Sequence, residues 1–395
     1  MKNDNKTANF RVKQALPYEF KRNYAYTRAW EFYRECGARG LNCHVSVGGL
    51  DSIVLYLFLR SIGITVPAIS VSSMEPPGNR QIHKALGVIS LQPSVRADGT
   101  RWTRQKILQE YGFPAISKSV AEKVETLQNP TEKNKKYRHE IVTGEKLDGE
   151  SVSRRLRLAK KWCELFAGGE NERLGMHYKI APPAVKLSDK CCYYLKEKPC
   201  KDWAKKNNSV PYMGLMASEG GRREVSLMLH GCNYFGARTI RSCPFAIFGR
   251  QDLLRLALEM EDWYQEHWEE LGAEIHLDTI VPEAYGVIAK REDGTLYTTK
   301  AQRTGCDVCG FGAHMEPRPN RYDRMLAENP VKWDYWMHRC CTDEQGQPYG
   351  WGVVLDYCGI PWRPETLAED IRQQQEKEQK KASQKRAEGS NGRGN

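Results

Sequence analysis

Two groups of residues in this sequence have the types and spacing that chemistry requires. The first is the loop from Ser46 to Ser52, where Gly48 and Gly49 stand between a strand-like and a helix-like apolar segment. Glycines allow close approach, so successive N–H groups and the N-terminus of the next helix can bind a phosphate or sulfate. Asp51 and Ser52 can cap that helix or contact the ligand and its metal ion. A plain strand-to-helix turn is the alternative interpretation.

The second group consists of four of the thirteen cysteines. Cys191 and Cys192 are adjacent in a helical segment, and Cys306 and Cys309 form a CxxC in a glycine-rich stretch. Four thiolates suit an iron–sulfur cluster, with zinc as the alternative. Neighbouring helical residues point about 100° apart, so both members of the CC pair reach one metal group only in strained or terminal geometry. Cys232 is therefore the alternative fourth ligand.

Together these motifs resemble those of the phosphoadenosine-phosphosulfate (PAPS) reductase family. The loop is similar to the family's SGGxDS pyrophosphate loop, with Val47 in place of its first serine and Leu50 where reductases often have lysine. The CC and CxxC pairs resemble the [4Fe–4S] ligands of adenosine-phosphosulfate (APS) reductases. Similar segments, among them RSCPFAIFGRQDLL and VVLDYCGIPW, extend the resemblance over most of residues 41–361. It implies an adenine nucleotide ligand (PAPS, APS or ATP), a [4Fe–4S] cluster and a thioredoxin-like reductant.

Arginines form a third set of candidates. The resemblance implies that Arg222 and Arg223, in the sequence MASEGGRRE, face the phosphates of the nucleotide. Guanidinium forks bind phosphate in a bidentate manner, although arginines on a surface loop are the alternative. The arginines between residues 318 and 324 could form a basic face over nucleic acid, but we expect helix packing with a solvated side.

The resemblance leaves three functions open. In a reductase, a cysteine thiolate attacks the sulfur of PAPS, and a thioredoxin-like reductant then releases sulfite. The nearest counterpart of the family's C-terminal nucleophile is Cys358, which lacks the preceding glutamate and is expected to be structural. The second function is ATP-dependent sulfur transfer to tRNA or DNA (thiolation or phosphorothioation). The third is a non-catalytic, nucleotide-bound iron–sulfur subunit.

The elements that must position these residues are those of an α/β protein. The periodicity predicts a strand at 41–47, a helix at 51–63 and a strand at 66–73, and further alternation follows. This pattern predicts a doubly wound, mostly parallel sheet; the resemblance specifies an adenine nucleotide alpha-hydrolase-like, Rossmann-like fold. Helices are also expected at 153–168 and 188–199.

Composition sets the domain boundaries. We expect an N-terminal helical segment at 1–40, the nucleotide-binding domain at 41–290, an irregular cysteine-containing module at 291–364 and a charged tail at 365–395, which is either disordered or a fraying helix. Residues 129–153 are expected to be an exposed loop.

The bulk composition favours an intracellular protein that binds anions. Thirteen cysteines is an odd number, which disfavours a fully paired disulfide framework, and no apolar stretch is long enough to span a membrane. With a polar N-terminus, these features predict a cytoplasmic location. The net charge of +11 favours anionic partners, either a nucleotide or a nucleic acid.

Overall fold

The computed structural model describes residues 2–168, 178–302, 305–306 and 308–391. The chain divides into two compact units of two segments each: unit 1 is Met1–Val95 with Tyr194–Asp307, and unit 2 is Arg96–Tyr193 with Val308–Asn395. These boundaries differ from those expected from composition. Residues 96–193 of the expected nucleotide-binding domain belong to unit 2, and the expected C-terminal module is divided after residue 307.

Unit 1 contains a sheet with its covering helices and a separate hairpin. Its helices are α1 (Lys2–Gln14), α2 (Tyr18–Ala38), α3 (Leu50–Ser61), α4 (Pro77–Ala85), α11 (Lys198–Lys206), α12 (Gly221–His230) and α13 (Arg250–His267). Its strands are β1 (Asn42–Ser46), β2 (Ala68–Ser70), β3 (Ile89–Ser90), β5 (Ser209–Tyr212), β6 (Asn233–Phe235), β7 (Ile240–Ser242) and the hairpin β8 (Ile288–Lys290) with β9 (Leu296–Thr298).

The predicted α/β class with a mostly parallel sheet is confirmed. In the described residues, the main sheet has six strands in the order β3-β2-β1-β5-β7-β6, and only β6 runs antiparallel to its neighbour. The chain passes from β1 outward to β2 and β3, and it later returns to the other side of β1 with β5. The loops that follow β1 and β5 therefore diverge at their carboxyl ends, where parallel α/β sheets bind ligands.

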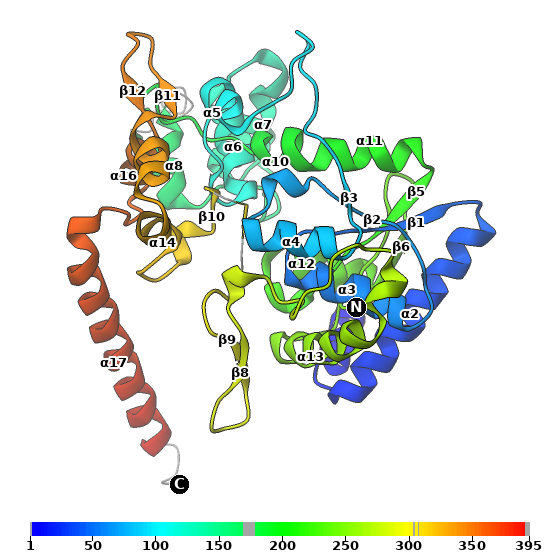
Figure 1. Cartoon of the computed structure of the whole chain (residues 1–395). Helices are drawn as coiled ribbons and strands as arrows, with labels where there is room; N and C mark the ends of the chain where they lie inside the picture. The colour runs from blue at the N-terminus through cyan, green and yellow to red at the C-terminus, as the bar shows by residue number, and fades with distance from the viewer. Residues whose placement is uncertain (1, 169–177, 303–304, 307, 392–395) are drawn as a thin grey trace. The chain divides into compact units, whose positions relative to one another are not determined.

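Helices cover both faces of this sheet. Successive residues of a strand point to opposite faces. Cys43 of β1 interacts with Cys36 of α2, whereas the next residue, His44, packs its ring edge-on against Trp203 of α11 with ring centroids 5.3 Å apart. Hence α2 and α11 lie on opposite faces, and Figure 1 shows the paired strands β1 and β5 between them.

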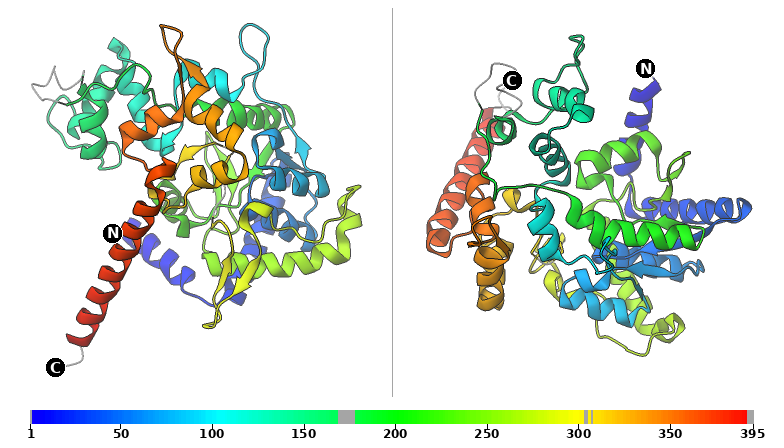
Figure 2. Two further views of the ribbon diagram at one scale, coloured as in Figure 1. Left: turned by 60° about the vertical axis from the view of Figure 1, so that its left-hand side comes forward. Right: turned by 90° about the horizontal axis from the view of Figure 1, so that it is seen from above.

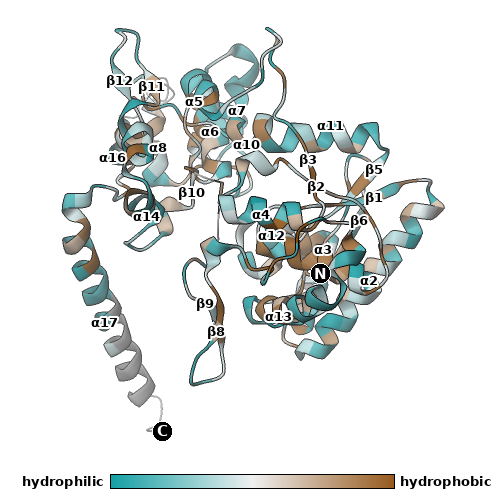
Figure 3. Cartoon of the chain, viewed as in Figure 1, coloured by the Kyte–Doolittle hydropathy of each residue, from teal (hydrophilic) through white to brown (hydrophobic). Residues whose placement is uncertain are grey.

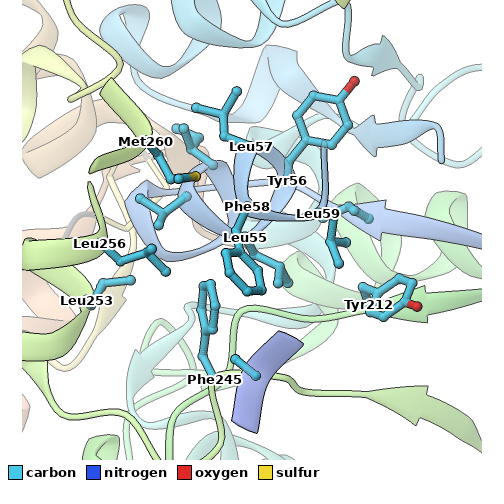
Figure 4. Close-up of a cluster of buried hydrophobic side chains, with 14 of the residues drawn as sticks. Leu55, Tyr56, Leu57, Phe58, Leu59, Tyr212, Phe245, Leu253, Leu256 and Met260 are labelled. Carbon is cyan, nitrogen blue, oxygen red and sulfur yellow. The ribbon is translucent and has the colours of Figure 1, made fainter. Parts of the chain in front are cut away.

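Helix α3, which follows the candidate loop, is the centre of the unit 1 core. Eight of its twelve residues are buried, and it is brown along much of its length in Figure 3. Phe58 packs against Phe245 with ring centroids 5.6 Å apart, and Leu253 and Met260 of α13 belong to the same cluster (Figure 4). Burial on this scale fixes α3 in position, and with it the loop at its N-terminus.

Unit 2 is mainly helical. Its helices are α5 (Arg104–Tyr111), α6 (Lys118–Gln128), α7 (Lys135–Thr143), α8 (Lys160–Phe166), α10 (Lys190–Cys192), α14 (Arg321–Glu328), α15 (Pro330–Asp334), α16 (Trp351–Cys358) and α17 (Leu367–Asn391). Short strand pairs join β4 (Ala115–Ile116) to β10 (Gly310–Phe311) and β11 (Cys341–Thr342) to β12 (Pro348–Tyr349). Two π-helical turns, Tyr193–Glu197 and Tyr335–Arg339, continue α10 and α15.

Three local expectations are corrected, and a fourth is decided between its two alternatives. Residues 129–153, expected as a loop, contain helix α7, and only the second half of the expected helix at 153–168 is helical, as α8. Of the disorder and the helix expected for the tail, the structure has the helix, α17, visible as one uninterrupted red helix in Figure 2. The expected irregular module contains three helices, α14 to α16. The sequence of α7 has only weak amphipathic periodicity, so it did not predict a helix. The first turn of α17 is held by an ion pair between Asp370 and the buried Arg318, which no local sequence pattern indicates.

No helix in the part of the chain that the structure describes is long and apolar enough to cross a membrane.

Candidate functional site

Side chains of α4 fix the backbone of the loop between β1 and α3. The carbonyl oxygen of Gly48 accepts hydrogen bonds from Asn79 Nδ2 at 3.0 Å and from His83 Nε2 at 2.9 Å. Because a carbonyl only accepts, the hydrogen of the His83 ring is on Nε2, and Ser72 Oγ donates to Nδ1 at 3.0 Å. Burial lowers the pKa of His83, which keeps this ring neutral. The peptide bond between Gly48 and Gly49 is thus fixed by hydrogen bonds from α4 to its carbonyl oxygen.

This arrangement leaves the N–H of Gly49 without an acceptor in the described residues. In a trans peptide the N–H points opposite to the C=O, so the N–H of Gly49 points away from α4. The N–H of Gly48 donates to Ser52 Oγ at 2.8 Å, and the N–H of Leu50 donates to the Tyr285 hydroxyl at 3.3 Å. Within the described residues, the N–H of Gly49 has no acceptor. It stands at the N-terminus of α3, where the helix dipole favours an anion.

The other predicted loop residues have distinct settings. Ser52 accepts from Gly48 and donates to the Gly49 carbonyl at 2.9 Å, so its hydroxyl closes the loop. Asp51 lies in the first turn of α3, with Oδ1 3.5 Å from Nη1 of Arg250. Ser46 ends β1, and its half-buried hydroxyl has no hydrogen bond within the described residues.

Arg250 is the charged neighbour of the loop that sequence analysis missed. It is the first residue of α13, and its guanidinium lies 5.9 Å from the ring centroid of Tyr285. The N–H of Gly249 donates to Asp252 Oδ2 at 2.7 Å and caps the helix. The segment GRQD carries this capping signal, which places Arg250 at a helix N-terminus, but only the fold brings that terminus to Asp51.

An ion pair between a buried carboxylate and a half-buried lysine also borders the loop. A Cβ atom placed on Gly48 would lie 3.5 Å from Oε1 of Glu75, and that carboxylate forms an ion pair with Lys196. Burial alone would lower the pKa of Lys196, but Cys306 and Glu75 outweigh burial and raise it. Lys196 therefore stays charged and neutralises the carboxylate, so that Glu75 does not oppose an anion at the loop.

The predicted arginine pair lies at the start of α12. Gly220 and Gly221 adopt φ values of +74° and +62°, which favour glycine. Arg223 forms an ion pair with Glu219, with Nη1 2.6 Å from Oε2, and about half of its side chain is exposed. The side chain of Arg222 lies outside the described residues. A phosphate-binding role for these two arginines stays a prediction.

Exposure separates the candidate metal ligands from most other cysteines. Cys191, Cys192, Cys306 and Cys309 are half-buried, as is Cys200 of α11, whereas the remaining eight cysteines are buried.

The CC pair occupies the single turn of α10, which passes directly into the π-helical turn Tyr193–Glu197. The two cysteines therefore lie at the start of a helical segment, which is where adjacent cysteines can both reach one metal group. Cys306 belongs to unit 1, and the other three predicted ligands belong to unit 2. Among the described residues, no group of three or more His, Cys, Asp or Glu side chains is gathered closely enough to hold a metal ion. The four-cysteine site stays a prediction.

The surroundings of Cys309 fit a sulfur-rich group in one respect. Two of the buried donors that lack an acceptor in the described residues are the Tyr322 hydroxyl and Nε1 of Trp351. Tyr322 is close enough to Cys309 for the thiolate charge to add to burial in raising the pKa of the tyrosine. Thiolate and sulfide are acceptors for such donors around iron–sulfur clusters. The backbone of Cys309 is held by Arg321, whose Nη1 donates to its carbonyl at 2.5 Å.

Two further cysteines that sequence analysis considered, Cys232 as a ligand and Cys358 as a nucleophile, are buried. Cys232, the alternative fourth ligand, is 3% exposed beside the Tyr24 hydroxyl in the unit 1 core, and burial raises its pKa to about 11. Cys358 ends α16 at 1% exposure, and burial raises its pKa to about 12. Burial disfavours the thiolate form, which is the nucleophile, in both residues, and the alternative role of Cys232 as a metal ligand stays a prediction. Cys358 is accordingly a packing residue rather than a mobile nucleophile.

Comparison with known proteins identifies no relative. No family model matches the chain, and the searches of curated proteins and of solved structures find no match.

Proposed function

We propose that this chain is a PAPS reductase-like enzyme of sulfur chemistry that binds an adenine nucleotide at residues 46–52. The observation that carries the proposal is the N–H of Gly49 at the N-terminus of α3, which has no acceptor in the described residues. It lies at the point where strand order reverses in a parallel sheet, as in nucleotide-binding α/β folds such as the adenine nucleotide alpha-hydrolase-like, Rossmann-like type. An anion there would receive a fixed hydrogen bond and the helix dipole together.

Arg250 supplies the mobile charge of this proposed site. Its Nη1 lies 3.5 Å from Asp51, which is longer than a strong charge-assisted hydrogen bond. The guanidinium can therefore exchange this partner for phosphate oxygens, which a guanidinium fork binds in a bidentate manner. The carboxylate of Asp51 is a suitable ligand for the metal ion that accompanies a triphosphate.

The proposed cofactor is a [4Fe–4S] cluster held by Cys191, Cys192, Cys306 and Cys309. When bound, it would supply electron transfer. The chain's own contribution would be thiolate ligands in the half-buried segments and hydrogen bonds from Tyr322.

Burial of Cys358 supports a second candidate reaction. Reduction of PAPS or APS needs a thiolate that reaches the nucleotide, and Cys358 does not provide one. ATP-dependent sulfur transfer needs no such residue near the C-terminus: the nucleotide activates an acceptor oxygen as its adenylate with release of pyrophosphate, and a sulfur donor then displaces AMP.

Nucleotide binding is tested by anaerobic calorimetry with PAPS, APS and ATP. Arg250→Gln should weaken binding about 10- to 100-fold, because a charge-assisted hydrogen bond contributes about 1.5–3 kcal/mol. Arg255→Gln is the matched control, since this arginine lies on the same helix and pairs with Glu19 on the surface. Wild-type affinity in Arg250→Gln would contradict the proposed site.

The reaction is tested with the same preparation. Sulfite release from PAPS or APS with a dithiol reductant would identify the reductase, and AMP and pyrophosphate formed from ATP only with nucleic acid would identify the transferase. Inertness in both assays would leave a binding protein.

Cluster content is measured as iron and acid-labile sulfide. Cys191→Ser should lower both, while Cys200→Ser, another half-buried cysteine, should not. A colourless wild-type protein with stoichiometric zinc would contradict the cluster.

A further inference from the structure

Residues 153–161 of unit 2 form a basic segment with no acidic residue. The sequence SRRLRLAKK places five arginines and lysines within nine positions, and all five side chains are exposed. The segment is irregular until α8 begins at Lys160. Within residues 96–193, 20 lysines and arginines outnumber 13 aspartates and glutamates. The basic segment is the densest part of this excess.

A buried ammonium group fixes the backbone of the basic segment. Lys123 of α6 is 5% exposed, and its Nζ donates to the carbonyl oxygens of Arg155 at 2.6 Å and Arg157 at 3.4 Å. The N–H of Leu158 donates to the Ile141 carbonyl of α7 at 2.8 Å. Burying an ammonium group is costly unless it is well hydrogen-bonded. The result is a segment whose arginines project from a fixed backbone rather than from a flexible loop.

The three arginines of the basic segment lack the ion pairs that some lysines of unit 2 form. Lys146 and Lys160, for example, each pair with a glutamate four residues later, Glu150 and Glu164. Within the described residues, the guanidinium groups of Arg154, Arg155 and Arg157 have no carboxylate partner. Three unneutralised charges within four residues repel one another. A bound polyanion would relieve this repulsion.

We propose that the basic segment binds the phosphate backbone of a nucleic acid. Guanidinium forks match phosphate geometry, and nucleic acid offers closely spaced charges, one per about 3.4 Å of each strand of a duplex. A membrane surface fits less well, because an interfacial segment needs exposed apolar side chains. Leu158 is 1% exposed and Leu156 is half-buried. The basic segment belongs to unit 2 and residues 46–52 belong to unit 1, so this inference rests on other residues than those of the nucleotide site.

The test measures the salt dependence of binding to fluorescein-labelled 30-nucleotide RNA and DNA, single-stranded and duplex, by anisotropy between 50 and 200 mM KCl. The triple variant R154Q/R155Q/R157Q removes three phosphate contacts. The slope of log K against log salt should then fall in magnitude by about 2–3, and affinity at 100 mM by about 100-fold. The control variant K201Q/K205Q/K206Q removes the same charge from α11 and should bind as the wild type does.

Each outcome decides the proposal. Wild-type affinity and slope in the arginine variant, or an equal loss in the α11 control, would overturn it. So would stronger competition by polyglutamate or by vesicles containing phosphatidylserine than by unlabelled nucleic acid. Circular dichroism and ATP affinity of the arginine variant are expected to match those of the wild type. ATP binding without nucleic acid binding would therefore overturn this inference and leave the nucleotide site standing.

Discussion

Gly214 provides a sharp test of how the fold positions the candidate loop. This residue follows β5, and its backbone lies against the first turn of α3. A Cβ atom at this position would lie 2.8 Å from the carbonyl carbon and oxygen of Asp51 and 3.0 Å from the nitrogen of Ser52. All three atoms are backbone, so no side-chain rotation can relieve the overlap. Gly214→Ala must push α3 and the end of β5 apart.

The cost follows from the burial of α3. Eight of its residues are packed in the core, so a shift of about 0.5 Å disturbs many contacts at once. Overpacking of this kind costs about 1–3 kcal/mol. The shift also moves the N–H of Gly49, and we expect nucleotide affinity to fall by about tenfold or more because a displaced donor no longer matches its acceptor.

The assay combines urea unfolding, followed by tryptophan fluorescence, with calorimetry of ATP binding. Gly37→Ala in α2 is the matched control, because no heavy atom lies within 4 Å of the added Cβ. That substitution should leave affinity unchanged and stabilise the helix by up to about 1 kcal/mol. If Gly214→Ala unfolds and binds within about 0.5 kcal/mol of the wild type, the argued close approach is wrong.

Two further predictions concern buried ionisable side chains. His44 is 2% exposed, its Nδ1 lies 2.8 Å from Ser209 Oγ, and burial lowers its pKa to about 4. The unfolded chain, with a histidine pKa of about 6.5, binds the proton first, so stability is constant above about pH 6.5 and falls by about 2 kcal/mol by pH 5. Urea unfolding at pH 7.5 and 5.0 should show a smaller pH effect in His44→Gln, and an unchanged one would refute the assignment. Arg318, with 2% of its side chain exposed, pairs with Asp323 and Asp370. Arg318→Met should cost about 3–5 kcal/mol by leaving Asp323 buried and uncompensated, and it should speed proteolysis of α17; equal proteolysis in both proteins would contradict that anchoring role.

The sequence by itself determined the local elements of the candidate site. Alternating apolar segments around Gly48 and Gly49 were sufficient to predict β1, the loop and α3, because a buried strand and a buried helix each have their own periodicity. The residue types of Cys191, Cys192, Cys306 and Cys309 suggested metal chemistry, which stays a prediction. Half-burial of all four was not visible in the sequence, because exposure depends on what packs against each segment.

Only the tertiary structure decided which groups meet at the loop. Asn79 and His83 hold the Gly48 carbonyl from more than thirty positions away, and Arg250 reaches Asp51 across about two hundred residues. The backbone of the basic segment is likewise held by the hydrogen bond from Lys123. The local sequence pattern places Lys123 in a helix but does not show that its ammonium group is buried. Hydrogen bonds and ion pairs between distant segments leave no periodic signal, because their geometry exists only after the sheet and helices have packed.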